Sequence, residues 1–189
     1  MDYQQIAVAF HLIGFALGLG GATVSDVIFF KSLRQGIINK DTTSVFISLS
    51  KIIWAGLILL IISGLTIFAL IYADRGSFPM LASPKWQAKL TLVAIVFING
   101  FVFRYKISKA IRSIASQTIT TATVTPVIWQ LAISGAVSIA SWYCILVLSL
   151  LPRGFSFPYP YIMGIYLAIV LTGIFVGKTM ILYAVRNNT

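Results

Sequence analysis

Charged side chains are scarce in this sequence. Only 10% of its 189 residues are Asp, Glu, Lys or Arg, while 59% are hydrophobic. Soluble domains carry about 25% charged residues, so this composition excludes a soluble globular domain. The sequence therefore predicts an integral membrane protein whose first partner is the lipid bilayer.

Residues that usually build catalytic or metal sites are equally few. The chain has one histidine, one cysteine and four acidic residues. Cys144 lies inside an apolar run, and a lone cysteine excludes an intramolecular disulfide. No Cys/His group has the spacing of metal ligands, and no nucleophile–base pair or carboxylate dyad can be assembled from so few groups. We therefore expect a protein that is not an enzyme.

Long apolar runs dominate the chain instead. Five of them reach the length of about 20 residues that crosses a bilayer as a helix. They predict an all-α membrane protein with five transmembrane helices in a single bundle, forming one domain over residues 1–189. Residues 1–5 contain an acid and no Lys or Arg, so we expect the first run to be a span and not a cleaved signal peptide. The expected spans are residues 5–30, 52–72, 86–105, 126–151 and 161–185.

Basic residues are concentrated in two of the four loops. The first and third loops hold eight Lys and Arg residues, whereas the second and fourth hold Arg75, Lys85 and Arg153. Because cytoplasmic loops carry the excess of Lys and Arg, we predict the N-terminus outside and the C-terminus in the cytoplasm. No soluble domain exists to carry a binding face, so the formal net charge of +10 indicates orientation and not a nucleic-acid partner.

The ends of two spans carry signals for longer helices. Asp41 to Ser44 can cap a helix that leads straight into the second span. The basic residues that follow the third span predict that its helix extends into the headgroup region.

The first span carries a narrow face of small and polar residues. His11, Gly14, Gly18, Gly21 and Ser25 fall within an arc of about 80° on a helix. The rest of the span is mostly Phe, Leu, Val and Ile. Small residues let transmembrane helices approach closely, so this face is expected to contact protein and not lipid.

Three later spans show comparable faces. The fourth has a polar stripe, the third holds two polar side chains, and the fifth has a seam of small residues. We therefore expect the first, third, fourth and fifth helices to surround a polar seam, and the second, apolar except for Ser63 and Thr66, to be the most exposed to lipid. The residues of these faces are Lys89, Asn99, Gln130, Ser134, Gly135, Ser138, Ser141, Trp142, Tyr166, Gly173 and Gly177.

His11 has two competing interpretations. As a structural residue it is a neutral imidazole hydrogen-bonded to a facing helix, with Ser149 of the fourth span or Tyr166 of the fifth as expected partners. As a functional residue it is a ligand to a metal or to haem.

The other polar groups in the membrane divide in the same way. Asp26 pairs with Lys31 or Arg34, or it serves transport or a proton relay. Lys89 is expected to extend to the interface, and Asn99 to bond across a helix contact. The candidate ligand-binding residues are His11, Asp26, Lys89, Asn99, Ser134, Ser138 and Trp142, with His11 also the candidate metal ligand.

A histidine before a glycine pair, His11 with Gly20-Gly21, opens the first helix. This placement resembles the CopD-like copper-resistance membrane domains and related uncharacterised small bacterial membrane proteins. Similar segments are residues 51–54, Asn99-Gly100, and residues 134–138 followed by Trp142. The resemblance implies a compact helical bundle in the bacterial inner membrane and copper handling. One His, one Cys and four Met residues without paired spacing are a poor set of soft-metal ligands, so the fold can carry over without the metal.

The sequence thus predicts a polytopic inner-membrane protein that binds or transports a small ligand or ion through the polar seam. The alternatives are a haem-binding or redox subunit that uses His11, and a subunit that packs against a larger membrane complex or a second copy of itself. Haem is the cofactor that the first alternative would use, and copper is the metal that the resemblance to CopD-like domains implies.

Overall fold

The computed structural model describes residues 2–35, 40–109, 112, 121–152, 154 and 157–186. Arg153, which the charge count used, lies outside these ranges. Within them the chain is helical and has no strand, and five helices are long and apolar enough to cross a membrane. The elements are α1 (Tyr3–Arg34), α2 (Lys40–Arg75), η1 (Pro79–Ala82), α3 (Pro84–Val102), the π-helical turn η2 (Phe103–Ile107), α5 (Thr121–Val124), α6 (Ile128–Leu150) and α7 (Tyr159–Arg186). For the described residues, the prediction of an all-α protein with five helices long and apolar enough to cross a membrane is confirmed.

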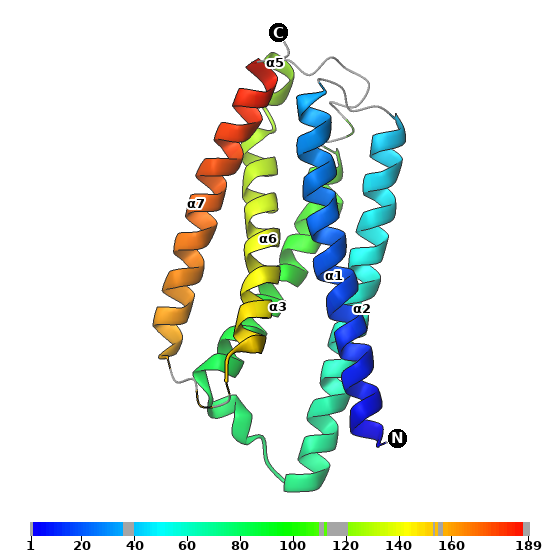
Figure 1. Ribbon diagram of the computed structural model, residues 1–189, viewed down its shortest axis with the longest axis vertical. Helices are drawn as coiled ribbons and strands as arrows, with labels where there is room; N and C mark the ends of the chain where they lie inside the picture. Colours follow the sequence, from blue (N-terminus) through cyan, green and yellow to red (C-terminus); the bar gives the residue numbers. More distant parts are fainter. Residues whose placement is uncertain are drawn as a thin grey trace.

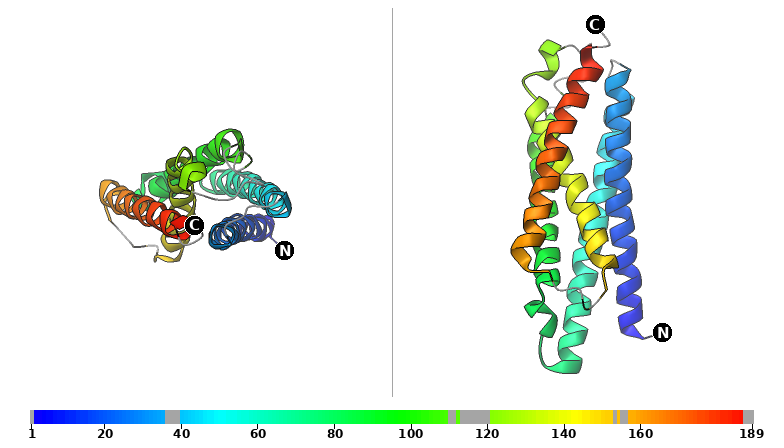
Figure 2. Two further views of the ribbon diagram at one scale, coloured as in Figure 1. Left: turned by 90° about the horizontal axis from the view of Figure 1, so that it is seen from above. Right: turned by 60° about the vertical axis from the view of Figure 1, so that its left-hand side comes forward.

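The five long helices lie side by side along the long axis of the molecule (Figure 1). The N-terminus and the C-terminus lie at opposite ends, termed here the lower and upper end as in Figure 1. α1 packs along α2, while α6 packs against α3, α7 and α1. Seen from above, α6 lies between α7 and the α1–α2 pair (Figure 2).

Two helix ends follow directly from local sequence. Gly76 has a φ of 65° and donates its N–H to the Tyr72 carbonyl at 2.8 Å, which ends α2 with a left-handed residue. Pro84 opens α3, where its missing N–H costs no hydrogen bond. Lys85 follows and donates from Nζ to the Leu151 carbonyl, so its charge lies at the C-terminal end of α6.

Glycines bring α1 and α2 into close contact. A Cβ on Gly14 would lie 2.8 Å from the Gly56 carbonyl oxygen, and a Cβ on Gly21 would lie 2.7 Å from the Ile53 side chain. The prediction that the small face of the first span contacts protein is confirmed. The second span, expected to be the most exposed to lipid, covers that face of α1, and its apolar window is about as buried as those of α3 and α7.

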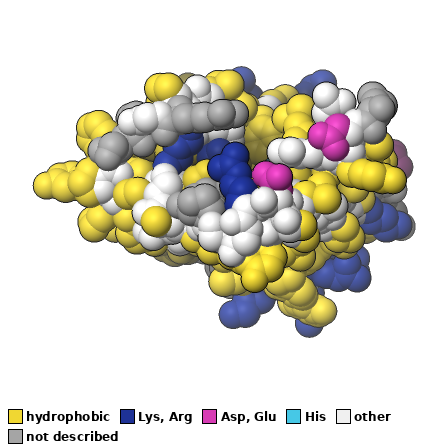
Figure 3. Space-filling view, turned by 90° about the horizontal axis from the view of Figure 1, so that it is seen from below, with side chains coloured by type: hydrophobic (Ala, Val, Ile, Leu, Met, Phe, Trp, Pro, Cys, Tyr) yellow, Lys and Arg dark blue, Asp and Glu magenta, His cyan; other side chains and the backbone are white. Residues whose placement is uncertain are grey.

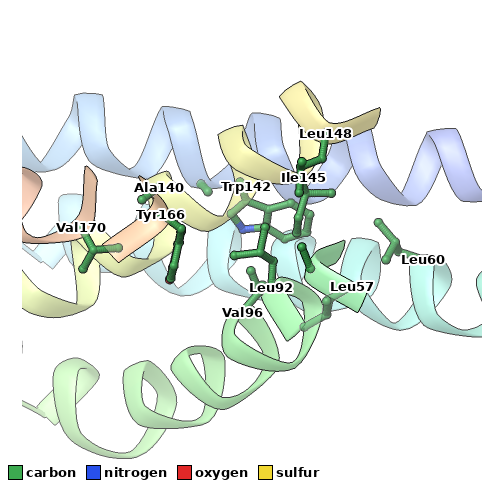
Figure 4. Packing of buried hydrophobic residues seen from close by; sticks show 12 residues of the cluster. Leu57, Leu60, Leu92, Val96, Ala140, Trp142, Ile145, Leu148, Tyr166 and Val170 are labelled. Carbon is green, nitrogen blue, oxygen red and sulfur yellow. The ribbon is translucent and has the colours of Figure 1, made fainter. Parts of the chain in front are cut away.

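Two apolar clusters hold the helices together. The cluster toward the upper end includes Leu33, Ile181 and Val185. The other surrounds Trp142, which is 1% exposed and lies among Ile145, Leu148 and the side chains of α2 and α3 (Figure 4). Because lipid chains are as apolar as these side chains, the clusters hold the helices together by close van der Waals packing and not by removing apolar surface from water.

Candidate functional site

Asp26 lies in the membrane-spanning part of α1 and borders two cavities. The larger has a volume of about 270 Å³ and lies between α1, α6 and α7. The smaller, of about 80 Å³, lies toward α2 and α3. Ser25, Asp26, Phe46 and Phe103 line both. The carboxyl group therefore lies where two internal spaces meet, about 12 Å below the upper end of its helix.

Glycines on two helices open the larger cavity. A Cβ on Gly135 would lie 3.9 Å from Asp26 Oδ1, so the missing side chain leaves room beside the carboxyl group. On α7, a Cβ on Gly173 would lie 3.2 Å from the Ala136 Cβ, and Gly177 faces Ala132 at 3.9 Å. These small residues let α6 and α7 approach while space remains next to Asp26.

The wall of the larger cavity is apolar and rich in aromatic rings. Four phenylalanines contribute, with Phe29 and Phe30 from α1, Phe46 from α2 and Phe103 from η2. Asp26 is the one ionisable residue in the lining of either cavity. The site is thus a partly open cavity lined by aromatic rings, with a single acidic group.

Asp26 is not neutralised by the part of the chain that the structure describes. Its carboxyl group makes no ion pair or hydrogen bond with a described residue. The ion pair that the described residues do form joins Asp74 and Arg75 at 3.7 Å, and these two exposed side chains lie far along the chain from Asp26. Lys31 and Arg34 on the same helix are both exposed. The predicted pairing of Asp26 with Lys31 or Arg34 is therefore wrong, because the carboxyl group faces α6 and the two basic side chains lie in the open.

Asn99 and Ser134 join α3 to α6 beside the cavities. Asn99 Nδ2 donates to the Ser134 carbonyl at 3.1 Å, and Ser134 Oγ donates to Asn99 Oδ1 at 3.2 Å. The prediction that Asn99 bonds across a helix contact is confirmed. This reciprocal pair holds α3 against α6 at the level of the smaller cavity, which Ser138 and Trp142 also line.

His11 lies apart from this site. It is about 22 Å along α1 from Asp26, since the two are fifteen residues apart on one helix. Its Nδ1 is 3.1 Å from both the Leu60 carbonyl oxygen and Ser63 Oγ of α2. A carbonyl oxygen can only accept, so Nδ1 carries the proton and donates to it, and Nε2 keeps its lone pair.

The histidine thus behaves as its structural interpretation predicts, but with different partners. The expectation that Ser149 or Tyr166 would bond to it is wrong, because α2 and not α6 or α7 covers this face of α1. Among the described residues no group of three or more His, Cys, Asp or Glu side chains could hold a metal ion. His11 is therefore left with a single usable nitrogen and belongs to no such group in that part of the chain.

Lys89 also lies away from Asp26, toward the lower end of α3. Its Nζ is 5.2 Å from the centre of the Trp86 ring, a cation–π contact, and Lys85 one turn before it is buried. Seen from below, Lys and Arg side chains lie at a hollow of this end, and an acidic side chain lies beside them (Figure 3). Lys89 extends toward the end of its span, as expected.

The structure therefore divides the predicted residue set in two. Five of the seven candidates line the two cavities or tie their walls together, namely Asp26, Asn99, Ser134, Ser138 and Trp142. His11 and Lys89 lie elsewhere. Sequence reasoning missed Phe46, which lies on the helix expected to lead from Asp41 to Ser44 into the second span, and Phe103, which lies at the end of the third span. Neither side chain is polar, so no signal in the sequence marked them as part of a site.

No family model, curated protein or solved structure matches this chain. Its function is therefore argued from the geometry of the chain itself, and the resemblance to CopD-like domains stays a prediction.

Proposed function

We propose that the protein binds a small lipophilic cation at Asp26 and transports it across the membrane. The observation that carries this proposal is an acidic side chain without a described partner, facing an aromatic cavity inside the membrane. Ionisable groups in transmembrane helices are costly and usually mark substrate or ion pathways. The faces of phenylalanine rings attract cations, so Phe29, Phe46 and Phe103 favour a positively charged ligand, as the Asp26 carboxylate does.

The lining favours an organic cation over a metal ion. Hard metal ions need about six or more oxygen ligands, whereas the polar side chains of the larger cavity are those of Ser25, Asp26 and Ser134. Its volume of about 270 Å³ is near the lower end of the range for small-molecule sites. One carboxylate and apolar walls fit a monovalent amine or quaternary ammonium ion with a single aromatic or short aliphatic group.

Transport is the class of function that two adjoining cavities favour. A group that borders both can receive a cation from one and release it to the other, provided that the helices between them move. The excess of Lys and Arg near the upper end supports an orientation with that end in the cytoplasm of a bacterial cell, where the membrane would be the inner membrane. In this orientation Asp26 lies nearer the cytoplasmic surface.

Binding of benzyltrimethylammonium to purified protein in detergent, measured by calorimetry, tests the proposal. Asp26→Asn should weaken binding by about 30-fold or more, because the charge partner of a desolvated cation is lost. Asp41→Asn is the matched control, since it removes a carboxylate that is exposed and outside the cavities, and it should leave affinity unchanged. Equal affinity of the wild type and Asp26→Asn, or no binding by the wild type, would exclude Asp26 as the cation site.

Uptake into liposomes separates transport from binding alone. Wild-type protein should accumulate labelled benzyltrimethylammonium in response to an inside-negative potential, and Asp26→Asn should not. Binding without uptake would leave a binding protein and would refute the transport part of the proposal.

A further inference from the structure

A third cavity, of about 320 Å³, lies at the upper end between α2 and η2. Its lining is basic and rich in hydroxyl groups. No acidic side chain is among the residues that line it. The polar lining residues are Thr43, Ser50, Lys51, Arg104, Tyr105, Ser108, Lys109 and Arg112. We term it the basic cavity.

The π-helical turn gathers two of these cations. In a regular α-helix Arg104 and Lys109, five residues apart, would point about 140° away from each other. A π turn bonds residues i and i+5, so it changes the direction of the residues that follow it relative to a regular α-helix. Ser108 Oγ donates to the Phe103 carbonyl at 3.2 Å, a bond that spans the same five-residue separation. Beyond this widened turn, Lys109 lines the basic cavity together with Arg104 and with Lys51 of α2.

Four cationic side chains in one cavity repel one another unless an anion is present. None of the four forms an ion pair with a described acidic residue. Arg104 and Lys51 are exposed, so an anion from outside can reach them. The cavity is thus open, positively charged and supplied with hydroxyl donors.

We propose that the basic cavity binds a phosphate group, carried by the headgroup of an anionic phospholipid. The guanidinium groups match a phosphate bidentately, Lys51 and Lys109 add point charges, and the hydroxyl groups of Ser50 and Tyr105 can donate to the remaining oxygens. The cavity lies where two membrane-spanning helices end, which is the depth of phospholipid headgroups. Phe46, Ile47 and Phe103 form its apolar wall, which suits the glycerol and upper acyl region of a lipid better than a free ion. This inference does not depend on the proposed role of Asp26.

Native mass spectrometry of protein extracted from vesicles of phosphatidylglycerol and phosphatidylcholine in equal amounts tests it. The wild type should retain phosphatidylglycerol selectively. Lys51→Gln combined with Arg104→Gln should lower that retention by about tenfold or more. The matched control, Lys31→Gln with Arg34→Gln, removes the same charge from exposed positions near the same end and should retain as much as the wild type.

Glycerol 3-phosphate added at millimolar concentration distinguishes the two sources of the phosphate group. If it fails to displace the lipid, the site recognises phosphate at the membrane; if it displaces the lipid from the wild type alone, the site recognises phosphate, but the lipid as its source is refuted. Lys109→Gln is a second variant should the double substitution fail to fold. Equal retention by the wild type, the double variant and Lys109→Gln overturns the proposal, and so does an equal loss in the charge-matched control.

Discussion

Replacing Gly56 by alanine would test the contact between α1 and α2, and the structure sets the size of the effect. A Cβ on Gly56 would lie 2.7 Å from the Gly14 carbonyl oxygen and 2.7 Å from the Gly18 amide nitrogen. Both are backbone atoms that cannot rotate away. Restoring an ordinary contact of 3.4 Å therefore requires the two helices to separate by about 0.7 Å.

This separation of the two helices lowers the free energy of unfolding. A gap of about 0.5–1 Å removes a quarter to a half of the dispersion attraction of each atom pair across the interface. Overpacked substitutions of this kind cost about 1–3 kcal/mol. Gly20→Ala is the matched control, because nothing lies within 4 Å of a Cβ at Gly20 and the two substitutions gain the same helix propensity.

The measurement is the free energy of unfolding in a denaturant titration in mixed micelles. Gly56→Ala should be less stable than Gly20→Ala by about 1–3 kcal/mol, and Gly20→Ala should be as stable as the wild type or slightly more so. Equal stability of the two variants would mean that α1 and α2 do not approach through their glycines.

Three further predictions concern other parts of the fold. Asn99→Ala removes both hydrogen bonds between α3 and α6 and should cost about 1 kcal/mol in the same titration; no loss would indicate that the pair is not formed. His11→Gln keeps a donor for the carbonyl of α2 and should change the unfolding free energy by less than about 1 kcal/mol, while stoichiometric copper or iron in the wild type that this variant lacks would support the ligand hypothesis instead. In a Cys144→Ser background, an impermeant thiol reagent applied to intact cells should label Ser77→Cys and not Gln35→Cys, since the second lies at the end with the Lys and Arg excess; the reverse pattern would invert the topology. Asn39 and Ser113, in the first and third loops, would be shielded from the reagent in the same way, but they lie outside the described residues.

The number and position of the spans followed from the sequence alone, because the length of an apolar run is a local property that the bilayer thickness selects. The ends of helices outside the membrane could also be predicted in part from the sequence. Asp41 to Ser44 carry capping residues, and α2 begins beside them at Lys40, well before the apolar run at residue 52. The widened turn at Phe103–Ile107 could not be predicted, since nothing in the sequence of those five residues distinguishes i+5 from i+4 backbone hydrogen bonding.

The small face of α1 was determined by the sequence, but its partner was not. A row of glycines predicts that the backbone of another helix comes close, but it does not identify that helix. Because the second span is almost entirely apolar, it was not expected to cover this face, although its Gly56 lies against Gly14 and its Ser63 lies against His11. The partner of His11 was misplaced for the same reason.

The site around Asp26 shows the same division between local and tertiary information. The sequence determined that an acidic residue lies in the membrane, because its place within an apolar run is fixed by covalent order. Only the tertiary structure decided that Asp26 faces Gly135 and borders two cavities, and that Phe46 and Phe103, from other helices, enclose it. Covalent order sets the depth of each residue along its helix, whereas the rotation and pairing of helices depend on which complementary surfaces pack most closely, and that is a property of all five together.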